Sequence, residues 1–161
     1  MSCPWSDLEE SVEQLPVRPR MLVVEDDLDL QPVVWRAAYS IDPLLIVDWA
    51  TSAGSARRRL ESRRYVLVLA DYLLAEGSSG LRVARWARPA SGRFAMMSAF
   101  PVRDEMVGCG LAGCPFLPKP FSLRQLRGFL LGLLPASRSP SLPSAGSTRA
   151  VRSGDPDRRA S

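Results

Sequence analysis

Residues 65–71 read Tyr-Val-Leu-Val-Leu-Ala-Asp, a continuous apolar run that ends in a carboxylate. An apolar run without polar alternation is typical of a central parallel strand that is buried on both faces of its sheet. We therefore predict a strand over residues 65–70, with Asp71 at its carboxyl end. Such a strand requires parallel neighbours on both sides and helices over both faces of the sheet.

The chain on either side of this run alternates between strand-like and helix-like patterns. Short apolar segments predict strands, and apolar residues at helical spacing predict helices. Further strands are expected at residues 21–24, 44–47, 94–97 and 116–117, and helices at residues 29–39, 52–63, 79–87, 103–109 and 122–134. This alternation predicts an α/β fold with a doubly wound five-stranded parallel sheet. Of the common strand orders of such sheets, we adopt the flavodoxin-like order 2-1-3-4-5 as the expectation.

The sequence divides into three parts. Residues 1–19 are predicted to be a leader with one short amphipathic helix, because a capping box starts at Ser6 and apolar residues recur at helical spacing. Residues 20–136 carry the alternating pattern and form the folded domain. Residues 137–161 are rich in Ser, Pro and Arg and hold few apolar residues, so we expect this tail to be disordered.

Composition excludes several classes of chemistry. The chain of 161 residues contains no His, so a Ser-His-Asp triad, a Cys-His pair and a His-based zinc site are all excluded. The three cysteines stand at no metal-binding spacing, which favours reduced thiols and a cytoplasmic location. No apolar run approaches the roughly 20 residues that a membrane-spanning helix needs, and we expect no secretory signal and no membrane contact.

The charge pattern favours a protein partner over a nucleic acid. The formal net charge is +4, but the basic residues are scattered and are not interleaved with aromatic residues. We therefore expect no nucleic-acid partner, and we interpret the arginines of residues 57–64 as a solvated helix face. Lys119 is the only lysine among 21 basic residues, which indicates a site that needs a compact point charge.

Polar side chains follow four of the predicted strands, at the point where each strand ends. In an open α/β sheet, ligands bind at these carboxyl ends, where the strand order reverses. Carboxylates that crowd there repel each other unless a cation lies among them, and hard oxygen ligands indicate Mg²⁺. One carboxylate can then act as the nucleophile in phosphoryl transfer, with a hydroxyl and an ammonium to spread the charge. The set consists of Glu25, Asp26, Asp71, Ser98 and Lys119.

Each of these residues, taken alone, has a simpler interpretation. Glu25 and Asp26 could be acids at a helix N-terminus, Asp71 a turn cap, Ser98 a polar strand end and Lys119 a surface charge. The prediction rests on the combination of all four segments in the expected order.

Residues 20–136 resemble the receiver domain of two-component response regulators, including the single-domain chemotaxis regulator. The resemblance is carried by residues 22–27, 69–74, 97–99 and 116–121, together with Gly77 and Gly80. It implies that Asp71 is the phospho-acceptor and that Ser98 and Lys119 each contact a phosphoryl oxygen. It also implies a cis peptide bond between Lys119 and Pro120.

The resemblance further implies a Mg²⁺ site. Asp26, Asp71 and the main-chain carbonyl of Leu73 would bind the ion directly, and Glu25 would act mainly through water. Phe116 takes the position of the family's aromatic switch, which would move together with Ser98.

The implied function is that of a stand-alone receiver, which takes a phosphoryl group from a histidine kinase or phosphotransfer protein. The chain would catalyse its own phosphorylation and slow dephosphorylation without being a conventional turnover enzyme. It would signal to a downstream protein, or to a second copy of itself, through a face that includes Phe116, Leu131 and Leu134. The last predicted helix carries more apolar residues than one buried face can hold, which favours such a face. The alternative is a pseudo-receiver or adaptor that binds a protein without phosphorylation.

Overall fold

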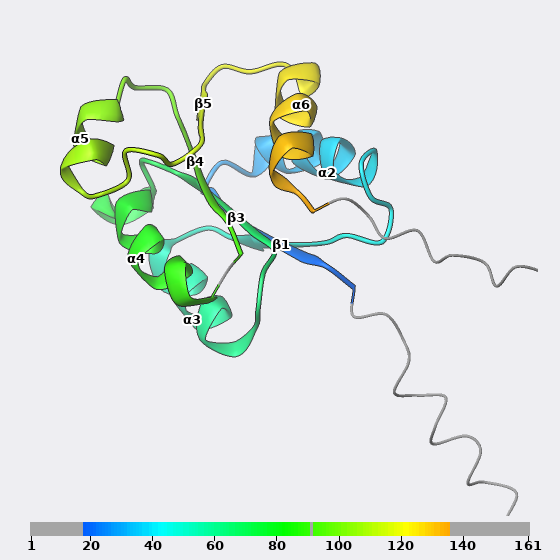
Figure 1. Ribbon diagram of the computed structural model, residues 1–161, viewed down its shortest axis with the longest axis horizontal. Coiled ribbons are helices and arrows are strands. Elements are labelled where there is room, and N and C mark those ends of the chain that lie inside the picture. The colour runs from blue at the N-terminus through cyan, green and yellow to red at the C-terminus, as the bar shows by residue number, and fades with distance from the viewer. Residues whose placement is uncertain (1–17, 91, 136–161) are drawn as a thin grey trace, which may run out of the picture.

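The computed structural model describes residues 18–90 and 92–135. The leader helix predicted within residues 1–19 and the tail predicted at residues 137–161 lie outside the described residues. A five-stranded parallel sheet forms the centre, with strand order β2-β1-β3-β4-β5 (Figure 1), which confirms the predicted topology. The strands are β1 (Arg20–Val24), β2 (Ile46–Ala50), β3 (Leu67–Asp71), β4 (Phe94–Ser98) and β5 (Phe116–Pro118).

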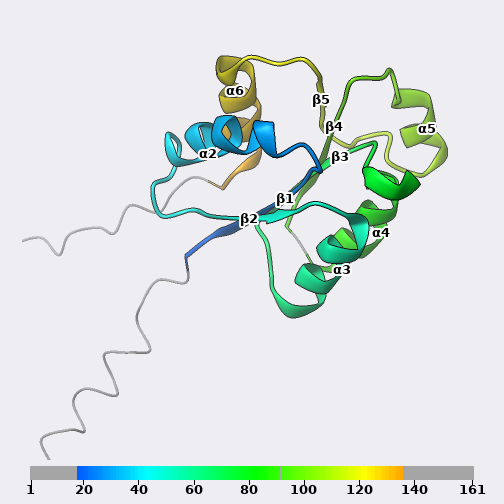
Figure 2. The same cartoon turned by 180° about the vertical axis from the view of Figure 1, so that it is seen from behind.

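Helices cover both faces of the sheet. They are α2 (Gln31–Tyr39), α3 (Ala53–Ser62), α4 (Gly80–Ala90), α5 (Arg103–Gly108) and α6 (Leu123–Leu133), with short 3-10 turns η1 (Leu28–Leu30) and η2 (Ala75–Gly77). Figures 1 and 2 show α2 and α6 on one face and α3, α4 and α5 on the other. All five residues of β3 are buried, as its continuous apolar run predicts. No helix within the described residues has both the length and the apolar character of a membrane span.

The helices begin where local signals place them. Ser122 and Gln125 form the predicted capping box of α6, in which each side chain bonds to the other residue's main chain. Pro32 lies in the first turn of α2, where the missing N–H costs no helical hydrogen bond. A second capping box, between Ser52 and Ser55, starts α3.

The second strand lies further along the chain than predicted. We expected residues 44–47, whereas β2 spans Ile46–Ala50 and has Asp48 at its centre. The Asp48 carboxylate accepts hydrogen bonds from Arg20 at 3.3 Å, Arg63 at 3.2 Å and Tyr65 at 2.9 Å. A charged residue can stand within this edge strand because three partners from neighbouring elements satisfy it.

The end of α6 corrects one prediction about the partner face. Leu134 was expected on an exposed face, but it is only 8% exposed and belongs to the hydrophobic core beside Leu130. The helix ends at Leu133, and Leu134 has extended backbone angles of φ −71° and ψ 142°. Helical spacing therefore no longer sets the direction of its side chain. Leu131, one turn earlier, is 54% exposed.

Candidate functional site

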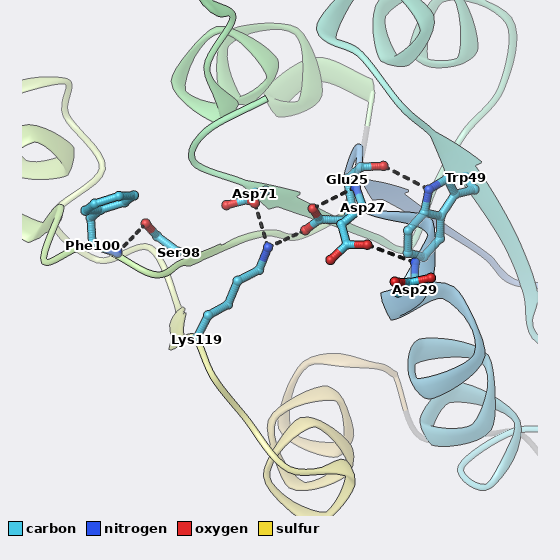
Figure 3. Close-up of polar contacts among 8 residues, drawn as sticks. All are labelled: Glu25, Asp27, Asp29, Trp49, Asp71, Ser98, Phe100 and Lys119. Carbon is cyan, nitrogen blue, oxygen red and sulfur yellow. Dashed lines mark hydrogen bonds and ion pairs between the residues drawn. The ribbon is translucent and has the colours of Figure 1, made fainter. Parts of the chain in front are cut away.

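The polar residues predicted at the strand ends meet at one edge of the sheet. Glu25 directly follows β1, Asp71 ends β3, Ser98 ends β4 and Lys119 directly follows β5. The Lys119 main-chain N–H donates to the Ser98 carbonyl at 2.7 Å, which joins the two last strand ends. Figure 3 shows Lys119 extending from its strand toward Asp71 and Glu25.

Lys119 bridges two buried carboxylates. Its Nζ lies 2.6 Å from Asp71 Oδ2 and 2.6 Å from Glu25 Oε2. These are short, charge-assisted hydrogen bonds. Burial acts to lower the pKa of Lys119, but the hydrogen bonds to Asp71 and Glu25 outweigh it and raise the pKa above its ordinary value. Lys119 is therefore a fixed positive charge at this edge of the sheet.

Glu25 is held rigidly and is almost completely buried, with 1% of its surface exposed. Its Oε1 accepts from the Asp27 main-chain N–H at 3.2 Å, and its carbonyl accepts from the indole N–H of Trp49 at 2.9 Å. Burial raises the pKa of Glu25 to about 7; the hydrogen bond from Lys119 opposes this shift, and the charge of Asp71 adds to it. An anionic Glu25 is thus costly at this position unless further positive charge lies nearby.

The acidic residues fit a divalent cation. Carboxylate oxygens of Glu25, Asp26 and Asp71 all lie within 4.8 Å of one another. The group contains three carboxylates and the one ammonium of Lys119, which contacts two of them, so ionised side chains leave an excess of negative charge. Oxygen ligands at this spacing suit Mg²⁺. Leu73 lies two residues after Asp71, and the binding of Mg²⁺ by its main-chain carbonyl stays a prediction.

Ser98 is buried beside this group, with 1% of its surface exposed. Its Oγ accepts a hydrogen bond from the Phe100 main-chain N–H at 3.0 Å. Because the oxygen acts as acceptor in this contact, the hydroxyl proton can still be donated to an anion. The predicted cis peptide bond between Lys119 and Pro120 is confirmed.

Phe116 lies next to a cavity that begins at Ser98. The cavity has a volume of about 450 Å³ and is lined by Ser98, Phe100, Pro101, Arg103, Phe116 and Pro118, among others. The Arg103 guanidinium lies 5.4 Å from the centre of the Phe116 ring. Phe116 therefore lines open space on one side, but its role as a switch stays a prediction.

Two residues support the site in ways that the sequence did not reveal. A Cβ atom on Gly80 would lie 2.3 Å from the Asp71 carbonyl oxygen, so α4 starts in direct contact with the main chain of Asp71. The Gly80 N–H also donates to the Tyr72 carbonyl at 2.9 Å. The resemblance at Gly80 indicated a constraint at this position but not its cause. The second residue is Trp49, whose indole N–H donates to the Glu25 carbonyl, and no sequence pattern predicted that contact.

Comparisons with solved structures support the fold described above. No family model and no curated protein matches the chain. The non-phosphorylated HemR receiver domain of Leptospira biflexa is 25% identical, with 75% of this chain and 98% of that chain covered and a TM-score of 0.62. A CheY-like receiver domain protein of Methanospirillum hungatei is 22% identical, with coverages of 70% and 90% and a TM-score of 0.60. The response regulator TrrA of Thermotoga maritima, solved in complex with Mg²⁺-BeF, is 23% identical, with coverages of 72% and 99% and a TM-score of 0.60.

In each comparison, the similarity covers 70–75% of this chain and at least 90% of the other chain. The sheet order and the flanking helices are those of the flavodoxin-like fold of CheY. The chain thus resembles the receiver domains of two-component response regulators and has their fold.

Proposed function

We propose that the chain is a stand-alone receiver that accepts a phosphoryl group on Asp71 in a Mg²⁺-dependent reaction. One observation carries the proposal: Lys119 Nζ lies 2.6 Å from both Asp71 and Glu25, in a group whose three carboxylates are close enough to share one cation. A structural ion pair needs one carboxylate for one ammonium, whereas a phosphoryl site needs a nucleophile, a cation site and a fixed positive charge.

The reaction follows from these positions. A carboxylate oxygen of Asp71 attacks the phosphorus of a phosphorylated donor, such as the phosphohistidine of a histidine kinase or phosphotransfer protein. The new O–P bond forms as the P–N bond to the donor imidazole breaks, and the electron pair leaves with that nitrogen. Lys119 compensates charge on one phosphoryl oxygen, and the Ser98 hydroxyl donates its proton as a hydrogen bond to another.

Glu25, Asp26, Asp71 and the Leu73 carbonyl would hold the ion. When bound, Mg²⁺ would offset the negative charge of the carboxylates and of the incoming phosphoryl group. Asp71 would then serve both as a ligand and as the nucleophile.

In this proposal, phosphorylation changes the affinity of a protein-binding face in the cytoplasm that includes Phe116 on β5 and Leu131 on α6. Leu134 is no longer part of this face because it is buried. The partner is a downstream protein or a second copy of the chain. A receiver that binds its partner without phosphorylation would keep such a face but would not need the paired carboxylates and Lys119.

One experiment separates these functions. The full chain is incubated with Mg²⁺ and a small phosphodonor, and its intact mass is measured with and without a chelator. We expect one phosphoryl group per chain, stable in acid and labile in base, only when Mg²⁺ is present. Asp71→Asn should accept none, whereas the isosteric control Asp29→Asn, outside the carboxylate group, should behave as the parent. An unmodified parent chain would support the adaptor function.

A further inference from the structure

The helices α3 and α4 present a surface with a strong excess of arginine. They pack against each other on the same face of the sheet (Figures 1 and 2). Within residues 53–64 and 80–87, the one acidic residue is Glu61. We call this surface the arginine face; its exposed arginines are Arg57, Arg58, Arg63, Arg64, Arg82 and Arg85.

Trp86 organises the centre of the arginine face. The guanidinium of Arg57 from α3 lies 5.6 Å from the Trp86 ring centre, and that of Arg82 from α4 lies 5.8 Å from it. Glu61 further fixes Arg57, at 2.8 Å from its Nε. A guanidinium attracted to an aromatic ring at this distance keeps N–H groups that can bind anions. Trp86 is half-buried and its exposed arginine neighbours are charged, so the surface suits an anionic partner.

The sequence of this chain contains a segment of matching charge. Residues 1–17 carry four acidic residues, Asp7, Glu9, Glu10 and Glu13, and no Lys or Arg. We propose that residues 1–17 bind to the arginine face through these carboxylates. The inference is independent of phosphorylation and of Mg²⁺.

The start of the described chain allows this contact. Arg20 in β1 and Arg63 after α3 both bind Oδ2 of Asp48, at 3.3 Å and 3.2 Å, so β1 begins close to the end of α3. Seventeen extended residues reach up to about 60 Å, whereas the 11 residues of α4 are about 16 Å long. The segment is therefore long enough to lie along either helix. Because it is tethered, its effective concentration is on the order of millimolar, and weak ionic contacts suffice.

A competing site lies on the opposite face of the sheet. The same segment carries Trp5 and Leu8, and the exposed apolar residues Tyr39 on α2 and Leu131 on α6 could receive them. Ionic binding to α3 and α4 weakens with salt, whereas apolar packing on α2 and α6 does not. Location and salt dependence therefore distinguish the two sites.

The test uses a native cysteine. A nitroxide label is attached to Cys3 in the full chain carrying Cys109→Ser and Cys114→Ala, and paramagnetic broadening of backbone amide signals is measured by NMR. We expect strong broadening over α3 and α4 at low ionic strength and little over α2 and α6. Roughly 0.5 M NaCl should remove most of the broadening, because exposed charges are screened at that concentration.

Two charge variants complete the test. Combined Asp7→Asn, Glu9→Gln, Glu10→Gln and Glu13→Gln should remove the broadening. The control pair Asp155→Asn and Asp157→Asn changes acids at the other end of the chain and should leave it unchanged. Broadening over α2 and α6, broadening that persists in salt, or none above the level of the neutralised variant would each overturn the proposal. In the unlabelled variants, amide shifts of the central strands β1 and β3 that match those of the parent verify the fold, while shift changes confined to α3 and α4 are expected from loss of the contact.

Discussion

Replacement of Gly80 by alanine should be costly, because the new methyl group meets main-chain atoms. The added Cβ would lie 2.3 Å from the Asp71 carbonyl oxygen and 3.1 Å from its carbonyl carbon, whereas ordinary contacts begin at 3.4 Å. Asp71 ends β3, which lies between β1 and β4 and cannot shift without disturbing both pairings. The start of α4 must therefore move away by about 1 Å, since steric overlap in a packed interior is not tolerated.

We expect this change to lower the free energy of unfolding by about 1–3 kcal/mol, the usual cost of overpacking. For a domain of this size, that corresponds to a fall in Tm of roughly 4–12 °C. The displaced loop also carries Leu73, so Mg²⁺-dependent modification of Asp71 should slow in the same variant.

Thermal and urea unfolding measure the first effect, and intact mass against time measures the second. Gly128→Ala is the matched control, because no atom lies within 4 Å of the position where its Cβ would be placed within α6. That change should raise the free energy of unfolding by about 0.5–1 kcal/mol, since alanine favours a helix interior. If Gly80→Ala were as stable as the parent, the close contact between α4 and Asp71 would not exist as described.

Three further predictions follow from individual contacts. Lys119→Arg should keep the fold but slow phosphorylation on the order of 100-fold, because a forked guanidinium replaces a point charge in a tight group; a rate equal to that of the parent would contradict this. Tyr65→Phe should cost about 1 kcal/mol in urea unfolding at neutral pH, because the hydroxyl donates to Asp48 at 2.9 Å. Burial, and next the bond to Asp48, raise the pKa of Tyr65 from 10 to about 12, so the stability that depends on the neutral phenol is complete below pH 10 and is lost toward pH 12. The Phe variant should lack this loss, and parallel pH profiles would contradict the assignment. Leu130→Ala should cost about 2–5 kcal/mol in the same assay and Leu131→Ala less than about 0.5, because the first is buried and the second is 54% exposed; equal costs would refute the assigned orientation of α6.

The parts of the fold that the sequence predicts are those fixed by local patterns. The run at residues 65–71 needs burial on both faces, and a strand so placed implies the rest of the parallel sheet. The same rule brings the strand ends together, so Glu25, Asp71, Ser98 and Lys119 could be assigned to one edge before any geometry was known.

Two predictions were wrong because local patterns show neither contacts with residues distant in sequence nor the residue at which a helix ends. We ended the predicted strand at residue 47 because a charged residue, Asp48, comes next. Nothing in the local sequence shows that three side chains will bond to its carboxylate; they are Arg20, Arg63 and Tyr65. Leu134 was placed by helical spacing, which stops applying one residue earlier, where the chain becomes extended.

The side-chain contacts within the site could not be predicted from local sequence patterns either. Spacing indicates that Lys119 and Asp71 share an edge, but not that one ammonium binds two carboxylates. The steric constraint at Gly80 depends on the packing of α4 against β3, which no sequence pattern specifies.

The central claim is that the carboxylate of Asp71 itself carries the phosphoryl group. The chain is phosphorylated with a small donor and Mg²⁺, reduced with borohydride, digested and sequenced by mass spectrometry. Reduction converts an aspartyl phosphate to homoserine and leaves free carboxylates unchanged. The account predicts homoserine at position 71 in proportion to the phosphate bound, and none without Mg²⁺. Homoserine at position 26 or 27 instead, or phosphate on a hydroxyl that borohydride leaves intact, would contradict it.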